Sequence, residues 1–288
     1  MSAQQSNVTI DKKDLQEARE SNVYFYRVDL PEISQPVQKL LEEYSGLSPD
    51  KIASHLHEVR TQAWNIYPYP SIGNWHFLTL GILTQPRYPE ILNRLKDGEK
   101  LLDLGCGFAQ DLRQLVFDGA PVESVHGLDL EKPFIDLGYD LFLDRAKFPS
   151  VNFTAADLLD PDSDAKNLRG EIDIIYASQI FHLWGWTSQV EVGKAVVKLL
   201  KPARRSLIVG YQLGALVAQE APHAPTKEGK MYLHDPASMQ RLWDEIGQAT
   251  GTEWVVDAWL DEPEIFDSYT KLGFGLQRIS FAIEAVVS

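Results

Sequence analysis

The residues best suited to hold a small ligand stand in one glycine-rich segment, LLDLGCGFAQDL, at positions 101–112. Its pattern predicts an apolar strand ending near Asp103, a tight turn through Gly105 and Gly107, and then a helix. Glycine at such a turn lets the backbone approach a ligand closely. A nucleoside triphosphate loop needs a Gly-Lys-Ser/Thr ending, and no lysine follows Gly107. A dinucleotide loop needs a third glycine where this chain has Gln110, so neither phosphate-binding loop fits.

The acidic side chain beside this turn favours a cationic ligand, because the Asp103 carboxylate would repel a pyrophosphate. S-adenosylmethionine carries an ammonium and a sulfonium group and no phosphate. The Asp-Leu-Gly-Cys-Gly sequence resembles the first motif of the class I S-adenosylmethionine-dependent methyltransferases. The resemblance implies that this cofactor lies against five residues of the segment: Asp103, Gly105, Cys106, Gly107 and Gln110. An ordinary strand-to-helix turn without a ligand is the alternative.

A second carboxylate, Asp129, ends the predicted strand SVHGLDL at 124–130 and stands 26 residues after Asp103. This spacing fits one β-α-β unit, and an acidic residue at the end of the second strand can accept hydrogen bonds from both ribose hydroxyls. Capping of the following helix is the alternative role. Together with the glycine loop, the spacing predicts that Asp129, with Leu130 beside it, contacts the cofactor.

The segment VNFTAADLLD at 151–160 alternates apolar and polar residues and ends in Asp157 and Leu158. It resembles the third strand of the same family, in which a carboxylate meets the adenine amine and an apolar neighbour covers the ring. The resemblance therefore implies that Asp157 and Leu158 hold the adenine. A loop aspartate without a ligand is the alternative.

A continuous apolar run within 171–186 predicts a fourth strand in a parallel sheet covered on both faces. Ser178 is predicted to contact the cofactor at its end. His182 follows at the carboxyl edge, where ligands of such sheets bind, and it is the candidate catalytic base. A structural histidine that orders the FHLWGW segment is the alternative, and we favour it.

An aromatic segment, WNIYPYPSIGNWHFL at 64–78, precedes the glycine loop. It is either a connector packed on the core or a lid that closes over cofactor and substrate. As a lid it would place aromatic rings beside the sulfonium, which they attract through cation–π interactions. Tyr67 is then predicted to contact the cofactor. The residues predicted to face the substrate are Tyr69, Trp75, Phe181, Trp184 and Tyr211.

Strand and helix patterns alternate along the rest of the chain. Further strands are predicted at 206–212, 253–260 and 276–286, the last two as an antiparallel pair flanking an acidic loop at 261–269. Helices are predicted to start at Ser48-Pro49, at a capping box formed by Ser188 and Glu191, and at Asp235-Pro236.

The family resemblance implies a Rossmann-like α/β fold with a mainly parallel seven-stranded sheet and a reversed edge strand. Residues 1–95 are predicted to form a helical extension with the aromatic lid, and residues 96–288 the S-adenosylmethionine-binding core.

Composition limits the partners of this 288-residue chain. Its formal net charge of -14 repels phosphate backbones and anionic lipid, which argues against nucleic acid or a membrane as the main partner. The lone Cys106 cannot form an internal disulfide, and no leader or long apolar run is evident, so a cytoplasmic protein is expected. His55 and His57 point to different helix faces, and we expect no metal. A homodimer is compatible with the sequence.

Four segments resemble a narrower fungal group of methyltransferases that serves secondary-metabolite pathways and includes carboxyl O-methyltransferases of meroterpenoid biosynthesis. They are 67–70, 181–186, 196–210 and 242–254. The resemblance implies methylation of a small polyketide or terpenoid acceptor. A carboxylate acceptor needs no base, whereas a hydroxyl does, and we expect a carboxylate. Two alternatives stay open: a cofactor-binding protein that catalyses a cyclisation or rearrangement, and a non-enzymatic regulatory module.

Overall fold

The centre of the protein is a seven-stranded sheet with the strand order β3-β2-β1-β4-β5-β9-β8. The computed structural model describes residues 16, 18–20, 22–202, 205–222, 229–261 and 275–286. The first five strands run parallel to one another, which confirms the predicted mainly parallel α/β sheet. The strands are β1 (Leu101–Leu104), β2 (Val125–Asp129), β3 (Phe153–Ala155), β4 (Ile174–Ser178), β5 (Leu207–Ala215), β8 (Trp254–Leu260) and β9 (Leu276–Ala285).

The reversed strand lies one position in from the edge. The predicted antiparallel pairing of the last two strands is confirmed, but β9 inserts between β5 and β8, so β8 is the edge strand. Burial explains this order. Strand β9 is buried almost throughout, as an interior strand must be, whereas β8 exposes Val255 and Asp257 to solvent.

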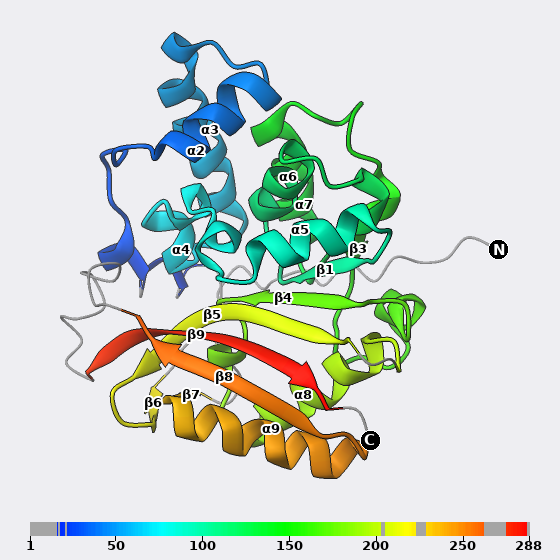
Figure 1. The fold of residues 1–288 in the computed structure, drawn as a ribbon. Helices are drawn as coiled ribbons and strands as arrows, with labels where there is room; N and C mark the ends of the chain where they lie inside the picture. The colour runs from blue at the N-terminus through cyan, green and yellow to red at the C-terminus, as the bar shows by residue number, and fades with distance from the viewer. Residues whose placement is uncertain are drawn as a thin grey trace.

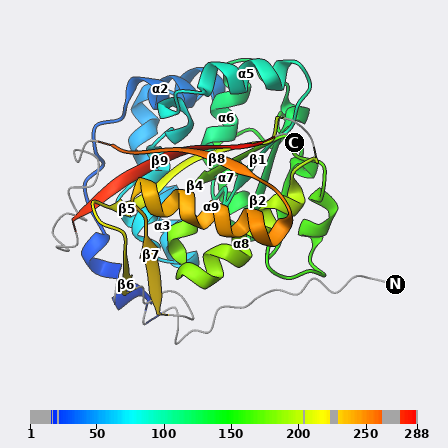
Figure 2. The ribbon, with the colours of Figure 1, turned by 60° about the horizontal axis from the view of Figure 1, so that its bottom comes forward.

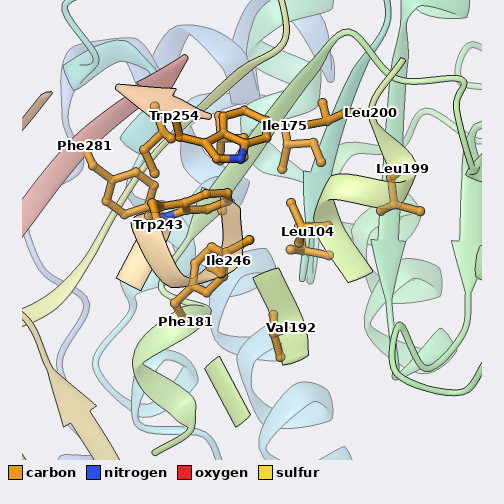
Figure 3. Packing of buried hydrophobic residues seen from close by; sticks show 14 of the residues in the cluster. Leu104, Ile175, Phe181, Val192, Leu199, Leu200, Trp243, Ile246, Trp254 and Phe281 are labelled. Atoms are coloured by element: carbon orange, nitrogen blue, oxygen red, sulfur yellow. The ribbon is translucent and has the colours of Figure 1, made fainter. Parts of the chain in front are cut away.

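Helices cover both faces of the sheet (Figures 1 and 2). On one face lie α5 (Tyr88–Lys96), α6 (Gln110–Phe117) and α7 (Lys132–Phe142), and on the other α8 (Trp186–Leu199) and α9 (Pro236–Thr250). Figure 3 shows the core under α8 and α9, where Trp243, Ile246 and Val192 pack against Leu104 and Phe281. A separate core lies between the sheet and α5, α6 and α7.

An N-terminal helical layer packs on α7 (Figure 1). It comprises α2 (Gln35–Lys39), a π-helical turn η2 (Leu40–Tyr44), α3 (Pro49–Ile66), α4 (Pro70–Gly73) and the 3₁₀ turns η3 (His76–Leu78) and η4 (Gly81–Thr84). The predicted helix start at Ser48-Pro49 is confirmed, although the Ser48 side chain makes no capping hydrogen bond. In the part of the chain that the structure describes, no helix is long and apolar enough to cross a bilayer.

The two other predicted helix starts differ in outcome. At α9, the Asp235 carboxylate accepts a hydrogen bond from Ser238 N (2.7 Å) and the Ser238 hydroxyl accepts one from Asp235 N (3.0 Å), which confirms the start at Asp235-Pro236. The capping box at Ser188 is wrong, because α8 already begins at Trp186 and Gly185 is its N-cap. Ser188 lies within the first turn.

A short hairpin between β5 and α9 was not predicted. It is formed by β6 (Gln219–Pro222) and β7 (Lys230–Leu233). An isolated bridge joins Gly214 to His234, so the hairpin continues the end of β5. The predicted acidic loop at 261–269 lies, beyond Asp261, outside the described residues.

Candidate cofactor and acceptor site

The glycine loop turns back on β2 directly after β1. The backbone N–H groups of Gly105 and Cys106 both donate to the carbonyl oxygen of Leu128, at 2.8 and 3.1 Å. Gly105 and Gly107 have φ values of +71° and +54°, and Ala109 has a φ of +53° immediately before α6. Left-handed backbone suits glycine best, which explains why the two glycines stand where the chain reverses. Gln110 is the first residue of α6.

Asp129 lies directly against this loop. Its Oδ2 accepts a hydrogen bond from Gly107 N at 2.7 Å and its Oδ1 accepts one from Glu131 N at 2.9 Å. The N-cap of α7 is Glu131, so Asp129 does not occupy the capping position. Backbone N–H groups therefore fix both oxygens of this carboxylate beside the loop, and a carboxylate, with about four acceptor sites, can accept further hydrogen bonds. The exposed Leu130 follows beside it.

Three carboxyl groups gather around the loop: Asp103, Asp111 and Asp129. Burial raises the pKa of Asp103 well above its usual range, and repulsion by Asp111 and Asp129 adds to the effect. Burial also raises the pKa of Asp111 to about 7 and that of Asp129 above its ordinary value. Within the described ranges, no lysine or arginine forms a salt bridge with any of them. The site therefore attracts a cation.

Asp111 was missed by sequence reasoning. It is 3% exposed in the first turn of α6, and its Oδ1 accepts a hydrogen bond from Ile82 N at 2.9 Å. The one sequence feature that could have indicated its burial is its position directly before Leu112, which begins the apolar face of the helix. Nothing in the local sequence indicates its contact with Ile82, which comes from the distant turn η4.

Turn η4 also covers the phenol groups of Tyr176 in β4 and Tyr211 in β5. A Cβ atom on Gly81 would lie 2.5 Å from the Tyr211 hydroxyl and 2.6 Å from the Tyr176 hydroxyl, so only glycine fits there. Burial and Asp111 raise the pKa of Tyr211 to about 12, and a hydrogen bond with Ser178 opposes this shift. The structure thus places Tyr211 and Ser178 together, with Tyr211 buried beneath η4.

The predicted lid reaches the glycine loop through a chain of aromatic rings. Tyr67 lies 4.4 Å from Tyr69 between ring centroids, Tyr69 lies 5.7 Å from Phe134, and Phe134 lies 5.9 Å from Phe108 of the loop. The pKa of Tyr69 is raised by burial and by the nearby Asp129 and Glu131. Its hydroxyl therefore lies near the carboxylate predicted to hold the ribose, on the cofactor side of the site.

Two of the residues predicted to face the substrate are buried in the core. Trp75 is 2% exposed, its indole N–H donates to the carbonyl oxygen of Arg27 (3.1 Å), and the Arg60 guanidinium lies 3.8 Å from its ring. Phe181 is fully buried and packs 6.0 Å from Trp243 (Figure 3). The aromatic content of a segment does not reveal which rings its fold buries, and a role of these two rings toward the substrate stays a prediction.

A strained residue directs the segment after β4. Gln179 has a φ of +55°, its N–H donates to Tyr211 O (2.7 Å), and its Oε1 accepts from Leu213 N (3.1 Å). The following Ile180 lies against the loop, where its Cδ1 would be 2.8 Å from a Cβ on Gly105. Non-glycine residues with positive φ often mark functional sites, and no sequence pattern predicted this one.

The half-buried His182 follows in the 3₁₀ turn η8 (Phe181–Leu183). The half-buried Trp184 ends this segment, and its carbonyl oxygen accepts from Tyr232 N of β7 at 2.9 Å. The segment that carries His182 is therefore held between the glycine loop and the hairpin.

Asp157 and Leu158 follow β3 next to the end of β2, since Ala156 N donates to Asp129 O at 2.9 Å. Asp157 is exposed and its Oδ1 accepts from Leu159 N at 2.8 Å, whereas Leu158 packs partly on the core. The structure brings both to the edge that carries Asp129.

We expect cofactor affinity to rise with pH. Because burial raises the pKa of Asp111 to about 7, the ligand-free protein retains the proton of this carboxyl group up to about that pH, and its free energy of unfolding falls as pH rises from about 4 to about 7. The raised pKa of Asp103 acts in the same direction. A bound cation favours the ionised carboxylates, so binding releases protons and tightens over the same range. Calorimetry at pH 5.5 and 7.5, in buffers of different ionisation enthalpy, would measure the affinity and the number of protons released on binding. Affinity that does not change with pH, in wild type and Asp111→Asn alike, would contradict this.

We expect residues 64–78 to exchange backbone hydrogens more slowly when S-adenosylhomocysteine is bound. Tyr67 and Tyr69 connect this segment to the glycine loop, so a ligand in the loop should stabilise it. Hydrogen exchange with and without the ligand would measure the change, with α9 on the opposite face of the sheet as the internal control. Equal protection in both states would support the connector role instead.

Comparison with known proteins agrees with this geometry. A family model described as "Meroterpenoid methyltransferase N-terminal domain" matches residues 25–78. The chain is 39% identical over 270 residues to O-methyltransferase atr3 of Stereocaulon alpinum, covering 93% of this chain and 78% of the relative. It is 41% identical over 241 residues to methyltransferase ausD of Penicillium brasilianum, covering 83% and 86%. The solved structure of the CurJ carbon methyltransferase has the same fold, at a TM-score of 0.50 and 13% identity over 90% of this chain and 72% of that one.

Proposed function

Because this chain belongs to the family of fungal meroterpenoid methyltransferases, whose cofactor is S-adenosylmethionine, we propose that it methylates an oxygen atom of a small polyketide or terpenoid acceptor. We further propose that this oxygen belongs to a carboxylate rather than a hydroxyl. The name of the Stereocaulon alpinum relative, an O-methyltransferase, supports oxygen as the acceptor atom.

One observation carries the cofactor assignment: the buried carboxyl groups of Asp103 and Asp111 and the half-buried one of Asp129 gather at a left-handed glycine loop, and no described lysine or arginine forms a salt bridge with any of them. Buried charges in proteins are normally paired, so this arrangement calls for a cation from outside the chain. Asp129 would hold the ribose, Asp103 would face the ammonium group, and Tyr69 would close over them. The cofactor supplies an electrophilic methyl group on its sulfonium.

Acceptor chemistry decides whether the protein must move a proton. Transfer to a carboxylate forms a carbon–oxygen bond as the sulfur–carbon bond breaks, and yields a methyl ester with no proton to remove. Alignment and exclusion of water then supply most of the rate enhancement. The covering elements described above, Tyr69 on one side and Ile180 on the other, suit that role. Transfer to a hydroxyl would additionally need a base such as His182.

We expect His182→Ala to lower turnover by no more than about tenfold, through lost positioning, and to leave the pH profile without a new basic limb. Loss of a general base would instead cost about 10²–10⁴ in rate, with activity recovering as the pH rises. Rates of wild type and variant between pH 6 and 9, with one confirmed acceptor, measure the difference. A thousandfold drop rescued by alkali would overturn the carboxylate proposal and make His182 the base.

An acceptor that carries both groups tests the proposal most sharply. We would supply methyl-labelled S-adenosylmethionine with aromatic polyketide acids that bear a carboxyl and a phenol hydroxyl on the same ring. A methyl ester releases labelled methanol in mild alkali, whereas an aryl methyl ether does not. We expect release. Label retained as an ether would show that the hydroxyl is the acceptor.

A further inference from the structure

Phe108, the last residue of the glycine loop before Ala109, is fixed from three sides. Its ring packs 5.1 Å from Phe77 of the N-terminal helical layer and 5.9 Å from Phe134 of α7. Its carbonyl oxygen would lie 2.6 Å from a Cβ on Gly138, so α7 can approach only because Gly138 has no side chain. The same carbonyl accepts a hydrogen bond from Arg113 Nη1 at 2.9 Å. The loop conformation therefore depends on groups beneath it.

Arg113 is the central group beneath the loop, and its side chain is entirely buried. Its Nε and Nη2 donate to the two carboxylate oxygens of Asp144, at 2.9 and 3.2 Å, and Asp144 is buried too. Such a two-point ion pair fixes the plane of the guanidinium. Removing either partner of a buried pair leaves an uncompensated charge, so the two act as a unit.

The N-terminal helical layer contributes a third residue, Tyr44, to this group of side chains beneath the loop. Tyr44 donates from its hydroxyl to Asp144 Oδ2 at 2.8 Å, across 100 residues of sequence. Burial and the adjacent Asp144 raise the pKa of Tyr44, so its hydroxyl keeps the proton it donates. The π-helical turn η2 sets the position of Tyr44, with Ser45 N donating to Leu40 O at 3.1 Å. Lys147 Nζ secures the same turn by donating to the carbonyl oxygen of Tyr44 (2.9 Å).

We propose that Arg113 and Asp144 are positioning residues for the cofactor loop, and that Tyr44 makes cofactor affinity depend on the N-terminal helical layer. The inference rests on the cofactor site proposed above. Its consequence is that the helical layer is part of the cofactor site as well as a cover for it. None of the three side chains touches the cofactor. Each acts through the carbonyl oxygen of Phe108, which sets the direction of the left-handed turn at Ala109.

The protein offers a matched control at the C-terminal end of α6, the helix that carries Arg113. Tyr88 of α5 donates from its hydroxyl to Asp118, the C-cap residue of α6, and burial and Asp118 raise its pKa in the same way. Tyr44→Phe and Tyr88→Phe therefore remove the same kind of tyrosine–aspartate hydrogen bond. The first bond leads through Arg113 to the carbonyl oxygen of Phe108, whereas the second lies at the C-terminal end of α6 and has no hydrogen bond to that carbonyl.

The test measures S-adenosylhomocysteine binding by calorimetry and melting temperature by circular dichroism for both variants. We expect similar falls in melting temperature, but a dissociation constant raised at least about fivefold by Tyr44→Phe and unchanged by Tyr88→Phe. Hydrogen exchange at residues 105–109 of the bound protein should also accelerate in Tyr44→Phe alone. Equal dissociation constants for the two variants would overturn the inference.

A double-mutant cycle strengthens the test. In an Arg113→Lys background, Tyr44→Phe should have little further effect on binding, because the two residues act on the same carbonyl group. Additive effects would overturn the proposed connection. If Arg113→Lys does not fold, the comparison of Tyr44→Phe with Tyr88→Phe still tests the inference. Failure of the wild-type protein to bind S-adenosylhomocysteine would contradict the proposed cofactor site itself, which distinguishes the two failures.

Discussion

Replacing Asp129 with alanine is expected to weaken S-adenosylhomocysteine binding by about 1.5–3 kcal/mol, the range for hydrogen bonds to a charged group. The variant removes the proposed acceptors for the ribose hydroxyls and also the 2.7 Å bond from Gly107 N that holds the loop. Calorimetry of wild type and variant at one pH would measure the loss.

Asp173→Ala provides the control. Asp173 also accepts a backbone hydrogen bond, from Lys100 N at 2.8 Å, but it precedes β4 and so lies at the opposite edge of the sheet. Its loss should lower stability and leave the dissociation constant unchanged. An unchanged dissociation constant in Asp129→Ala as well would mean that the ribose lies elsewhere.

Gly107→Val is expected to reduce binding further, by roughly a hundredfold or more. A Cβ on Gly107 would meet no protein atom within 4 Å, so the protein itself does not crowd this position. The penalty has two other sources. The φ of +54° costs a non-glycine residue about 1–2 kcal/mol, and a branched side chain would occupy the space through which the backbone approaches a ligand.

Gly170→Val separates these two contributions. Gly170 has a φ of +70° and equally open surroundings, but it lies in the segment before β4, away from the loop. Both variants should lose similar stability in circular dichroism melts, and only Gly107→Val should lose binding. Comparable binding by the two variants would show that no ligand passes close to Gly107.

Much of the fold could be predicted because its signals are local. Apolar runs of strand length marked the buried strands, and Asp235-Pro236 marked the start of α9, where the structure has a capping box with Ser238. The place of β9 between β5 and β8 was missed, because strand order depends on pairing between segments distant in the sequence. Trp186 begins α8 without a polar cap, so the capping pattern at Ser188 misled the prediction.

The site divides in the same way. Asp103, Gly107 and Asp129 could be located because one β-α-β unit fixes their spacing, and the structure brings them together at the edge where β1 and β2 end. Asp111 and Tyr44 could not, because their roles depend on contacts with Ile82 and Asp144 from other parts of the chain. The different surroundings of Trp75, which is buried beside Arg60, and Tyr69, which lies near Asp129, also could not be predicted, since both residues stand in one aromatic segment.

The most direct test is a crystal structure of the protein with S-adenosylhomocysteine. We expect the ribose hydroxyls within hydrogen-bonding distance of Asp129, the ammonium group facing Asp103, and Tyr69 closing over the nucleoside. That result would establish the carboxyl edge of β1 and β2 as the cofactor site and give the buried carboxylates their missing cation. A nucleoside bound elsewhere, with Asp103 and Asp129 facing no ligand, would contradict the account at its centre.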